Sequence, residues 1–173
     1  MQLFLRLVQR GDMFICEELS CLRPRPYFVK FFEFITHLAD PAVIVIYPFA
    51  LLLLPEASLL YCLILMFCLV INFSLTTVLK GIGGRSRPKK ILFNQDSPKG
   101  FYNEYAFPSG HTSAAFTVAT CFTAVSPGGV IIWWGLAALV GLSRIYLQEH
   151  FASDVLAGGL IGFLLTALIL GAL

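Results

Sequence analysis

Long apolar runs restrict the fold of this chain more than any other feature. Residues 57–79 contain no charged side chain, and about 20 mainly apolar residues are enough for a helix to cross the hydrocarbon core of a bilayer. Residues 32–54, 128–148 and 151–173 have comparable length and are also mainly apolar. The sequence therefore predicts an all-α integral membrane protein.

The amino-acid composition supports the same conclusion. Of the 173 residues, 58% are hydrophobic and 13% are charged, whereas soluble domains carry about 25% charged residues. The mean hydropathy of +0.82 is too high for a soluble globular protein. The length predicts one membrane-embedded domain, residues 1–173. The net charge of +2 gives no indication of a nucleic-acid partner, and no obligate protein partner is predicted.

The first 30 residues (1–30) are too polar to span and are predicted to form an interfacial segment. On a helix, Leu3 and Leu7 would share one face, and Arg6 and Arg10 would lie on the other. This amphipathic pattern is typical of a helix that lies in the plane of the membrane surface. The two arginines also interrupt the apolar run that a cleaved signal peptide requires.

A fifth segment, residues 109–126, is rich in Ser, Thr, Ala and Gly. Small side chains allow helices to approach closely, so this segment is predicted to lie at the centre of the bundle. The total is about five transmembrane helices plus the interfacial helix. Within the first apolar segment, His37, Asp40 and Pro41 predict a kink or a start inside a protein-lined pocket.

Following the chain from helix to helix brings its polar stretches to one end of the bundle. The sizeable loop, residues 80–108, follows the helix 57–79 and precedes the helix 109–126. The tight turn 126–129 lies at the opposite end, so the connection near residues 148–151 returns to the end that holds the loop. The 80–108 loop is therefore predicted to be an active-site loop.

The first polar cluster reads KGIGGRSRP, residues 80–88, and contains Lys80 and Arg87 around a glycine-rich turn. A planar guanidinium can bind two oxygens of one phosphate. Basic residues that merely flank a membrane span would give the same pattern.

The second cluster reads AFPSGHTSAAF, residues 106–116. If Ser109 caps the following helix, the N–H groups of Gly110 and His111 are left without partners inside the helix, and such an end binds anions. A bound anion would favour the protonated form of His111. The alternative is an ordinary capped helix with an incidental histidine.

The third cluster reads SRIYLQEHFASD, residues 143–154. On one helix, His150 and Asp154 would share a face, so the carboxylate could accept the imidazole N–H and leave the other ring nitrogen free to attack. Arg144 is a further candidate to bind phosphate. The alternative is an ion pair at the membrane edge, but three such clusters at one end together favour a phosphate site.

Taken together, these residues resemble the three-part signature of the type 2 phosphatidic acid phosphatase superfamily, which also includes vanadium haloperoxidases. The matching patterns are K-x6-RP (80–88), PSGH (108–111) and SR-x5-H-x3-D (143–154). They occur in the family's order over about residues 80–154. Membrane members usually have six spanning helices, whereas five are predicted here.

The resemblance implies a metal-independent phosphatase that needs no cofactor. It implies that His150 is the nucleophile that forms a phosphohistidine, that Asp154 orients His150, and that His111 protonates the leaving oxygen. It also implies a set of residues that hold the phosphoryl oxygens, namely Lys80, Arg87, Ser109, Gly110 and Arg144.

Two other functions use the same cations. An anion transporter or binding protein would need the positive charges but no nucleophile, so the pair His150 and Asp154 would have no role in it. A haloperoxidase would need bound vanadate and usually has a soluble fold, which the hydropathy contradicts. A phosphatase that acts on a lipid in the bilayer is therefore favoured.

The resemblance allows several lipid substrates: lipid A 1-phosphate, phosphatidylglycerol phosphate, undecaprenyl diphosphate and phosphatidic acid. Arg85, Lys89, Lys90 and Lys99 could bind further anionic groups of a large head group, which slightly favours lipid A. Relatives that act on envelope lipids imply a bacterial inner membrane location with the site facing the periplasm. A count of positive charges gives the opposite orientation.

Overall fold

The computed structural model describes residues 2–21, 25–94 and 105–172, and these residues form helices and no strand. The predicted all-α fold is confirmed. The helices are α1 (Gln2–Cys21), α2 (Pro26–His37), α3 (Pro41–Ile44), α4 (Tyr47–Leu51), α5 (Leu59–Gly83), α6 (Pro88–Phe93), α8 (Gly110–Val125), α9 (Val130–Tyr146) and α10 (Ala152–Gly171), with a 3-10 turn at Pro127–Gly129.

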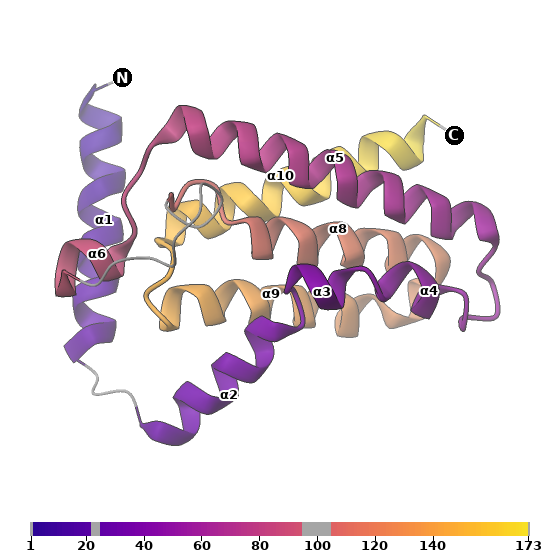
Figure 1. Ribbon diagram of the computed structural model, residues 1–173, viewed down its shortest axis with the longest axis horizontal. Helices are drawn as coiled ribbons and strands as arrows, with labels where there is room; N and C mark the ends of the chain where they lie inside the picture. Colours follow the sequence, from indigo (N-terminus) through magenta and orange to yellow (C-terminus); the bar gives the residue numbers. More distant parts are fainter. Residues whose placement is uncertain (1, 22–24, 95–104, 173) are drawn as a thin grey trace.

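Four long helices, α5, α8, α9 and α10, lie side by side, and α1 stands across one end of them (Figure 1). Helix α8 contacts α5, α9 and α10, so the predicted central position of this segment is confirmed. The C-terminal end of α5, the N-terminal end of α8 and the α9–α10 connection meet beside α1. We call this end of the bundle the polar end.

Three helical stretches in the described part of the chain are long and apolar enough to cross a membrane: Leu59–Phe93, Pro127–Tyr146 and Ala152–Gly171. A fourth candidate is a bent pair, Pro26–His37 with Pro41–Leu51, whose two parts meet at 46°. The predicted kink is confirmed. Proline has no N–H and keeps the preceding residue out of the helical conformation, and Asp40 is accordingly extended (φ −67°, ψ 144°).

Glycines allow α10 to pack directly on the backbone of α8. A Cβ atom placed on Gly158 would overlap the carbonyl oxygen of Ser109, and one on Gly162 would overlap that of Ser113. The side chain of Asn72 joins α5 to the same helix: its Nδ2 donates to Thr117 Oγ1 (2.5 Å), and its Oδ1 accepts from the Ser113 hydroxyl (2.7 Å). Small residues and buried hydrogen bonds hold membrane helices together in this way.

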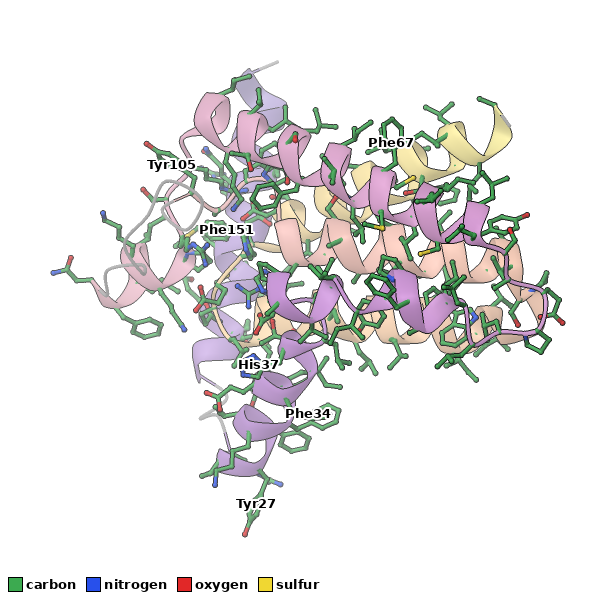
Figure 2. The ribbon with its side chains drawn as sticks, turned by 45° about the vertical axis from the view of Figure 1, so that its right-hand side comes forward. Tyr27, Phe34, His37, Phe67, Tyr105 and Phe151 are labelled. Carbon is green, nitrogen blue, oxygen red and sulfur yellow. The ribbon has the colours of Figure 1, made fainter. Side chains whose placement is uncertain are left out.

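The outer surface of the bundle is apolar. Tyr27 and Phe34 on α2 and Phe67 on α5 point away from the bundle (Figure 2), and each is at least half exposed. Exposed apolar side chains over long helices fit contact with lipid tails. The N-terminal segment is helical as predicted, but the side chains of Leu3, Leu7 and Arg6 lie outside the part of the chain whose side chains are described.

The contact between α8 and α10 gives a testable prediction for Gly162→Ala. The added methyl group meets the backbone of Ser113 rather than a movable side chain, so the variant should lose about 1–3 kcal/mol of stability. Gly135→Ala on α9 is the matched control, because its Cβ would have no atom within 4 Å and alanine favours a helix. Thermal unfolding in detergent should show a lower midpoint for Gly162→Ala alone; equal midpoints would contradict the close packing.

Candidate active site

Direct contacts join the three polar clusters at the polar end. Arg87 of the first cluster pairs with Glu149 of the third. The ring of His150 binds the carbonyl oxygen of Ala106, the first residue of the second cluster (2.6 Å). The N–H of Ser109 donates to the carbonyl oxygen of Asp154 (3.0 Å). The prediction that topology brings the three clusters together is confirmed.

The buried cations of the site are Lys80, Arg87 and Arg144, of which at most 7% of the surface is exposed. The ammonium group of Lys80 donates to the carbonyl oxygen of Tyr105 (2.8 Å), and Arg144 Nη1 donates to the hydroxyl of Thr36 on α2 (2.7 Å). Their positions at the polar end agree with the predicted role in holding an anion.

Glu149 is a site residue that the sequence analysis missed. Its Oε2 accepts from Arg87 Nη1 and lies 3.9 Å from Arg144 Nη2, and its Oε1 accepts from Lys89 Nζ (2.6 Å). Burial acts to raise the pKa of Glu149, but the Lys89 hydrogen bond and the charges of Arg144, Lys89 and Arg87 outweigh it, so the pKa lies below its usual value. Glu149 is therefore an anion that already occupies part of the cationic cluster.

The chain after α9 turns in a way that places His150 outside any helix. The N–H groups of Glu149 and His150 both donate to the carbonyl oxygen of Arg144 (3.0 and 3.2 Å). Gln148 adopts a left-handed conformation (φ 58°) at this turn. Because α10 begins at Ala152, His150 and Asp154 do not share one helical face, and this part of the prediction is wrong.

The predicted hydrogen bond from His150 to Asp154 is also wrong. His150 Nδ1 lies 3.9 Å from Asp154 Oδ2, which is longer than a hydrogen bond, and 2.6 Å from the carbonyl oxygen of Ala106. Because a carbonyl oxygen only accepts, Nδ1 carries the proton and Nε2 keeps its lone pair. The carbonyl oxygen of Ala106 thus fixes the tautomer of His150, a role that the sequence predicted for the carboxylate of Asp154.

His150 is held in its neutral form. Burial lowers its pKa well below the usual value, and the charges of Arg144, Arg87 and Lys80 lower it further. The imidazole therefore stays uncharged at neutral pH, with Nε2 unprotonated. A neutral imidazole surrounded by cations that attract phosphate is suited to nucleophilic attack.

Asp154 has a different set of partners from those predicted. Its Oδ2 accepts the N–H of Phe151 (2.9 Å), which starts α10, and its Oδ1 accepts from Arg85 Nη1 (2.7 Å). Arg85 Nη2 also binds Asp12 of α1 (2.6 Å), and Asp12 in turn accepts from the N–H and hydroxyl of Ser153 (3.0 and 2.5 Å). Arg85 thus joins two internal carboxylates, so its predicted binding to a lipid head group is not what the structure shows.

The start of α8 has the geometry that the sequence predicts. Ser109 Oγ accepts the N–H of Thr112 (3.4 Å) and contacts its hydroxyl (2.9 Å), so the serine caps the helix. The N–H groups of Gly110 and His111, in the first turn, have no acceptor within the helix. His111 Nε2 lies 3.1 Å from Asp40 Oδ1. Asp40 lies in the break between α2 and α3 and is a second site residue for which no role in the site was predicted.

An apolar cavity of about 290 Å³ begins beside His111 and Gly110 and extends between α3, α5 and α8. Its walls include Ile44, Phe73 and Ala114. The site therefore combines a cationic end with an apolar space. Within the described ranges, no three His, Cys, Asp or Glu side chains are arranged to hold a metal ion.

Comparison with known families agrees with the motifs. A model of the PAP2 superfamily matches residues 58–172, which is more than half of the chain. The chain belongs to the PAP2 superfamily. The match begins just before α5, so α1 to α4 lie outside it.

Individual relatives carry different names. The chain is 37% identical to a lipid A 1-phosphatase of Porphyromonas gingivalis over 87 residues, which is 48% of this chain and 19% of that protein. It resembles the crystal structure of a transmembrane PAP2-type phosphatidylglycerolphosphate phosphatase from Bacillus subtilis with a TM-score of 0.75 and 29% identity, covering 96% of this chain and 86% of that one.

The fold is also that of LpxE from Aquifex aeolicus, with a TM-score of 0.76, 24% identity and 94% of each chain covered. Both structures support the PAP2 membrane fold over nearly the whole length. The chain spans less than half the length of the first curated relatives it matches, 19% of one and 46% of another. The shared family thus gives the fold and the site motifs.

The contacts of Glu149 give a prediction for anion binding. Because its carboxylate occupies Arg87 and Lys89, Glu149→Gln should bind inorganic phosphate about tenfold more tightly, equivalent to about 1.4 kcal/mol. Glu33→Gln, an exposed position on α2, is the control for a general change in charge. Calorimetric titration with phosphate measures both. Equal or weaker binding by Glu149→Gln would mean that the carboxylate holds the cations in place rather than competing with the anion.

Proposed function

We propose that this chain is a metal-independent membrane phosphatase that hydrolyses a phosphate from a bacterial envelope lipid. In this proposal residues 1–173 act as one domain, with residues 80–108 as its active-site loop. The observation that carries the proposal is the state of His150: a buried neutral imidazole whose Nδ1–H is fixed on a carbonyl oxygen and whose Nε2 is unprotonated, within a cluster of cations.

The proposed reaction has two steps. In the first, Nε2 of His150 attacks phosphorus, the bond from phosphorus to the lipid oxygen breaks, and His111 gives a proton to that oxygen. In the second, water attacks the phosphohistidine, the N–P bond breaks, and His111 takes a proton from the water.

Charge stabilisation in the proposed reaction comes from side chains and backbone. Lys80, Arg87 and Arg144 offset the negative charge on the phosphoryl oxygens, together with the N–H groups of Gly110 and His111 at the start of α8. Ser109 contributes by capping α8, which fixes where those N–H groups point. Asp154 contributes by starting α10 and by holding Arg85, and its 3.9 Å approach to Nδ1 favours the developing charge on His150.

The apolar cavity supports a lipid substrate. It begins at His111 and Gly110 and is lined mainly by aliphatic and aromatic side chains, so it suits a tail attached to a phosphate held by the cations. A soluble phosphate ester has no group for this space. An anion transporter would have no use for the fixed tautomer of His150.

Among lipids, we favour lipid A 1-phosphate, with phosphatidylglycerol phosphate, undecaprenyl diphosphate and phosphatidic acid as alternatives. The support is the likeness to lipid A 1-phosphatases, one of which is 37% identical over the matched region. The charge argument contributes less than the sequence suggests, because Arg85 and Lys89 are paired with carboxylates. Lys99 lies outside the described residues.

Phosphate release from a panel of substrates tests the function. The purified protein in detergent should release phosphate from at least one of these four lipids in the presence of EDTA, and much more slowly from glycerol phosphate, which has no tail. Loss of activity with EDTA that is restored by magnesium or zinc would contradict metal independence. Equal rates with lipids and glycerol phosphate would contradict the role of the cavity.

His150→Ala is the matched variant for this experiment. It should release no phosphate and should form no acid-labile phosphoenzyme after rapid quenching with a radioactive phosphate substrate. A phosphoenzyme of normal amount in this variant would place the nucleophile elsewhere.

We also propose that the polar end faces the periplasm of a bacterial inner membrane. Lys80, Arg87 and Arg144 are buried at the site, so they should not be counted as signals of membrane orientation. The excess of positive charge that would place the polar end in the cytoplasm is smaller without them. The support for the periplasmic orientation remains the resemblance to enzymes of envelope lipids.

Cysteine labelling distinguishes the two orientations. Ile91→Cys on α6 lies at the polar end, and Gly128→Cys lies in the turn at the opposite end; both positions are exposed. Four of the five native cysteines, Cys16, Cys62, Cys68 and Cys121, are buried. Cys21, whose side chain lies outside the described part of the chain, is replaced by serine in both variants. A membrane-impermeant maleimide should label Ile91→Cys in intact spheroplasts and Gly128→Cys only after lysis. The reverse pattern would put the polar end in the cytoplasm.

A further inference from the structure

The imidazole of His111 is bound by a carboxylate from a distant part of the chain. His111 Nε2 lies 3.1 Å from Oδ1 of Asp40, 71 residues earlier in the sequence. Asp40 occupies the break between α2 and α3, before the segment that matches the PAP2 family model. The contact therefore joins a motif residue to a residue that the shared motifs do not include.

The Asp40 carboxylate has no capping role in its own segment. Asp40 is the residue before α3, but its side chain accepts no hydrogen bond from the backbone of that helix. Instead, each of its oxygens contacts an imidazole: Oδ1 contacts His111, and Oδ2 contacts His37 Nδ1 (2.6 Å). In Figure 2, His37 lies at the end of α2 where the chain turns toward the bundle. The side-chain contacts of Asp40 are thus made with two histidines and not with the backbone of its own helix.

The electrostatic surroundings of His111 give this contact a function. Burial and the charges of Arg144 and Arg87 disfavour a positive charge on His111, whereas the contact with the Asp40 carboxylate favours it. The proposed reaction needs His111 to carry a proton while the phosphate is bound. The negative charge of a bound phosphate would offset the two cations, and a carboxylate in contact with one ring nitrogen adds to this effect and fixes the orientation of the ring.

We propose that Asp40 is a positioning residue for His111: it accepts the Nε2–H and thereby favours the imidazolium form while a phosphate is bound at the cationic cluster. The other nitrogen, Nδ1, makes no hydrogen bond with any residue that the structure describes, and it is the atom that donates to the leaving oxygen. As the bond from phosphorus to oxygen breaks, its electron pair stays on oxygen, which takes the Nδ1 proton. Asp40 remains a carboxylate throughout, and His111 becomes neutral.

This inference rests on the proposed phosphatase activity, so its test compares two kinds of leaving group. An alkoxide leaving from a lipid phosphate needs a proton, whereas nitrophenolate leaves from 4-nitrophenyl phosphate without one. A carboxylate that serves only to join the α2–α3 break to α8 would affect both substrates equally. The dependence on the leaving group therefore separates a positioning role from a structural one.

The experiment measures the rate of the first turnover by rapid quenching for four variants on both substrates. Asp40→Asn keeps the size of the side chain and removes its charge, and Asp40→Glu restores the charge. His37→Gln is the matched control, because it changes the other partner of Asp40 and leaves His111 in place. The side chain of His37 is 68% exposed. His111→Ala defines the loss expected when the proton donor is absent.

We expect Asp40→Asn to lose about 10- to 100-fold on the lipid phosphate, less than the loss from His111→Ala, and to stay within about threefold of the parent on 4-nitrophenyl phosphate. Asp40→Glu should recover part of the loss, and His37→Gln should stay within about threefold on both substrates. Phosphate affinity by calorimetry should be unchanged in Asp40→Asn, which checks that the cationic cluster is intact.

Two results would overturn the inference: a loss of the same size on both substrates in Asp40→Asn, or no loss on the lipid phosphate. Failure of the proposed function looks different, because the parent protein would then release no phosphate from any substrate. If the parent is active and His111→Ala retains full activity on the lipid, the proton donor is another group, and the role given to Asp40 is also wrong.

Discussion

Buried positive charge at the polar end is the constraint on which the rest of the structure depends. Lys80, Arg87 and Arg144 are almost fully buried, and an unpaired buried ion costs several kcal/mol. Each is therefore given a fixed oxygen: a backbone carbonyl for Lys80, Glu149 for Arg87 and a hydroxyl for Arg144. A phosphate would be attracted by the same cations, so the contacts that stabilise the buried cations also affect the strength with which they bind an anion.

Close helix packing determines where that charge is presented. Because Gly158 and Gly162 let α10 lie against the backbone of α8, the N–H of Ser109 reaches the carbonyl oxygen of Asp154. The start of α8 and the start of α10 are thereby fixed relative to one another. The two histidines belong to these two helix starts, so a shift of α10 would change their relative positions. In this fold, the geometry of the site therefore depends on the packing of small residues between the helices.

The parts of the site that sequence reasoning predicted depend on local rules. Capping by Ser109 follows from its position before a helix, and the bend near Pro41 follows from the geometry of proline. The missed or mistaken parts depend on where a backbone turns. His150 was expected to share a helix with Asp154, but the left-handed Gln148 and the late start of α10 direct its ring Nδ1–H to the carbonyl oxygen of Ala106.

Partners far apart in the sequence were also missed, because no spacing rule relates them. Arg85 was predicted to bind a lipid head group but bridges Asp12 and Asp154, and Glu149, for which no role was predicted, pairs with Arg87. A sequence shows the sign of each side chain's charge but not which distant residue forms an ion pair with it.

The segment before the PAP2 match supports both sides of the site. Asp12 of α1 binds Arg85, which binds Asp154 next to His150, and Asp40 binds His111. A carboxylate of the N-terminal segment thus contacts His111 directly, and another is connected to His150 through Arg85 and Asp154. In the proposed reaction, the motifs in residues 80–154 supply the reacting groups, and the helices before them supply charges that orient those groups. Changes in α1 or in the α2–α3 break can therefore alter the chemistry of the site without altering any motif residue.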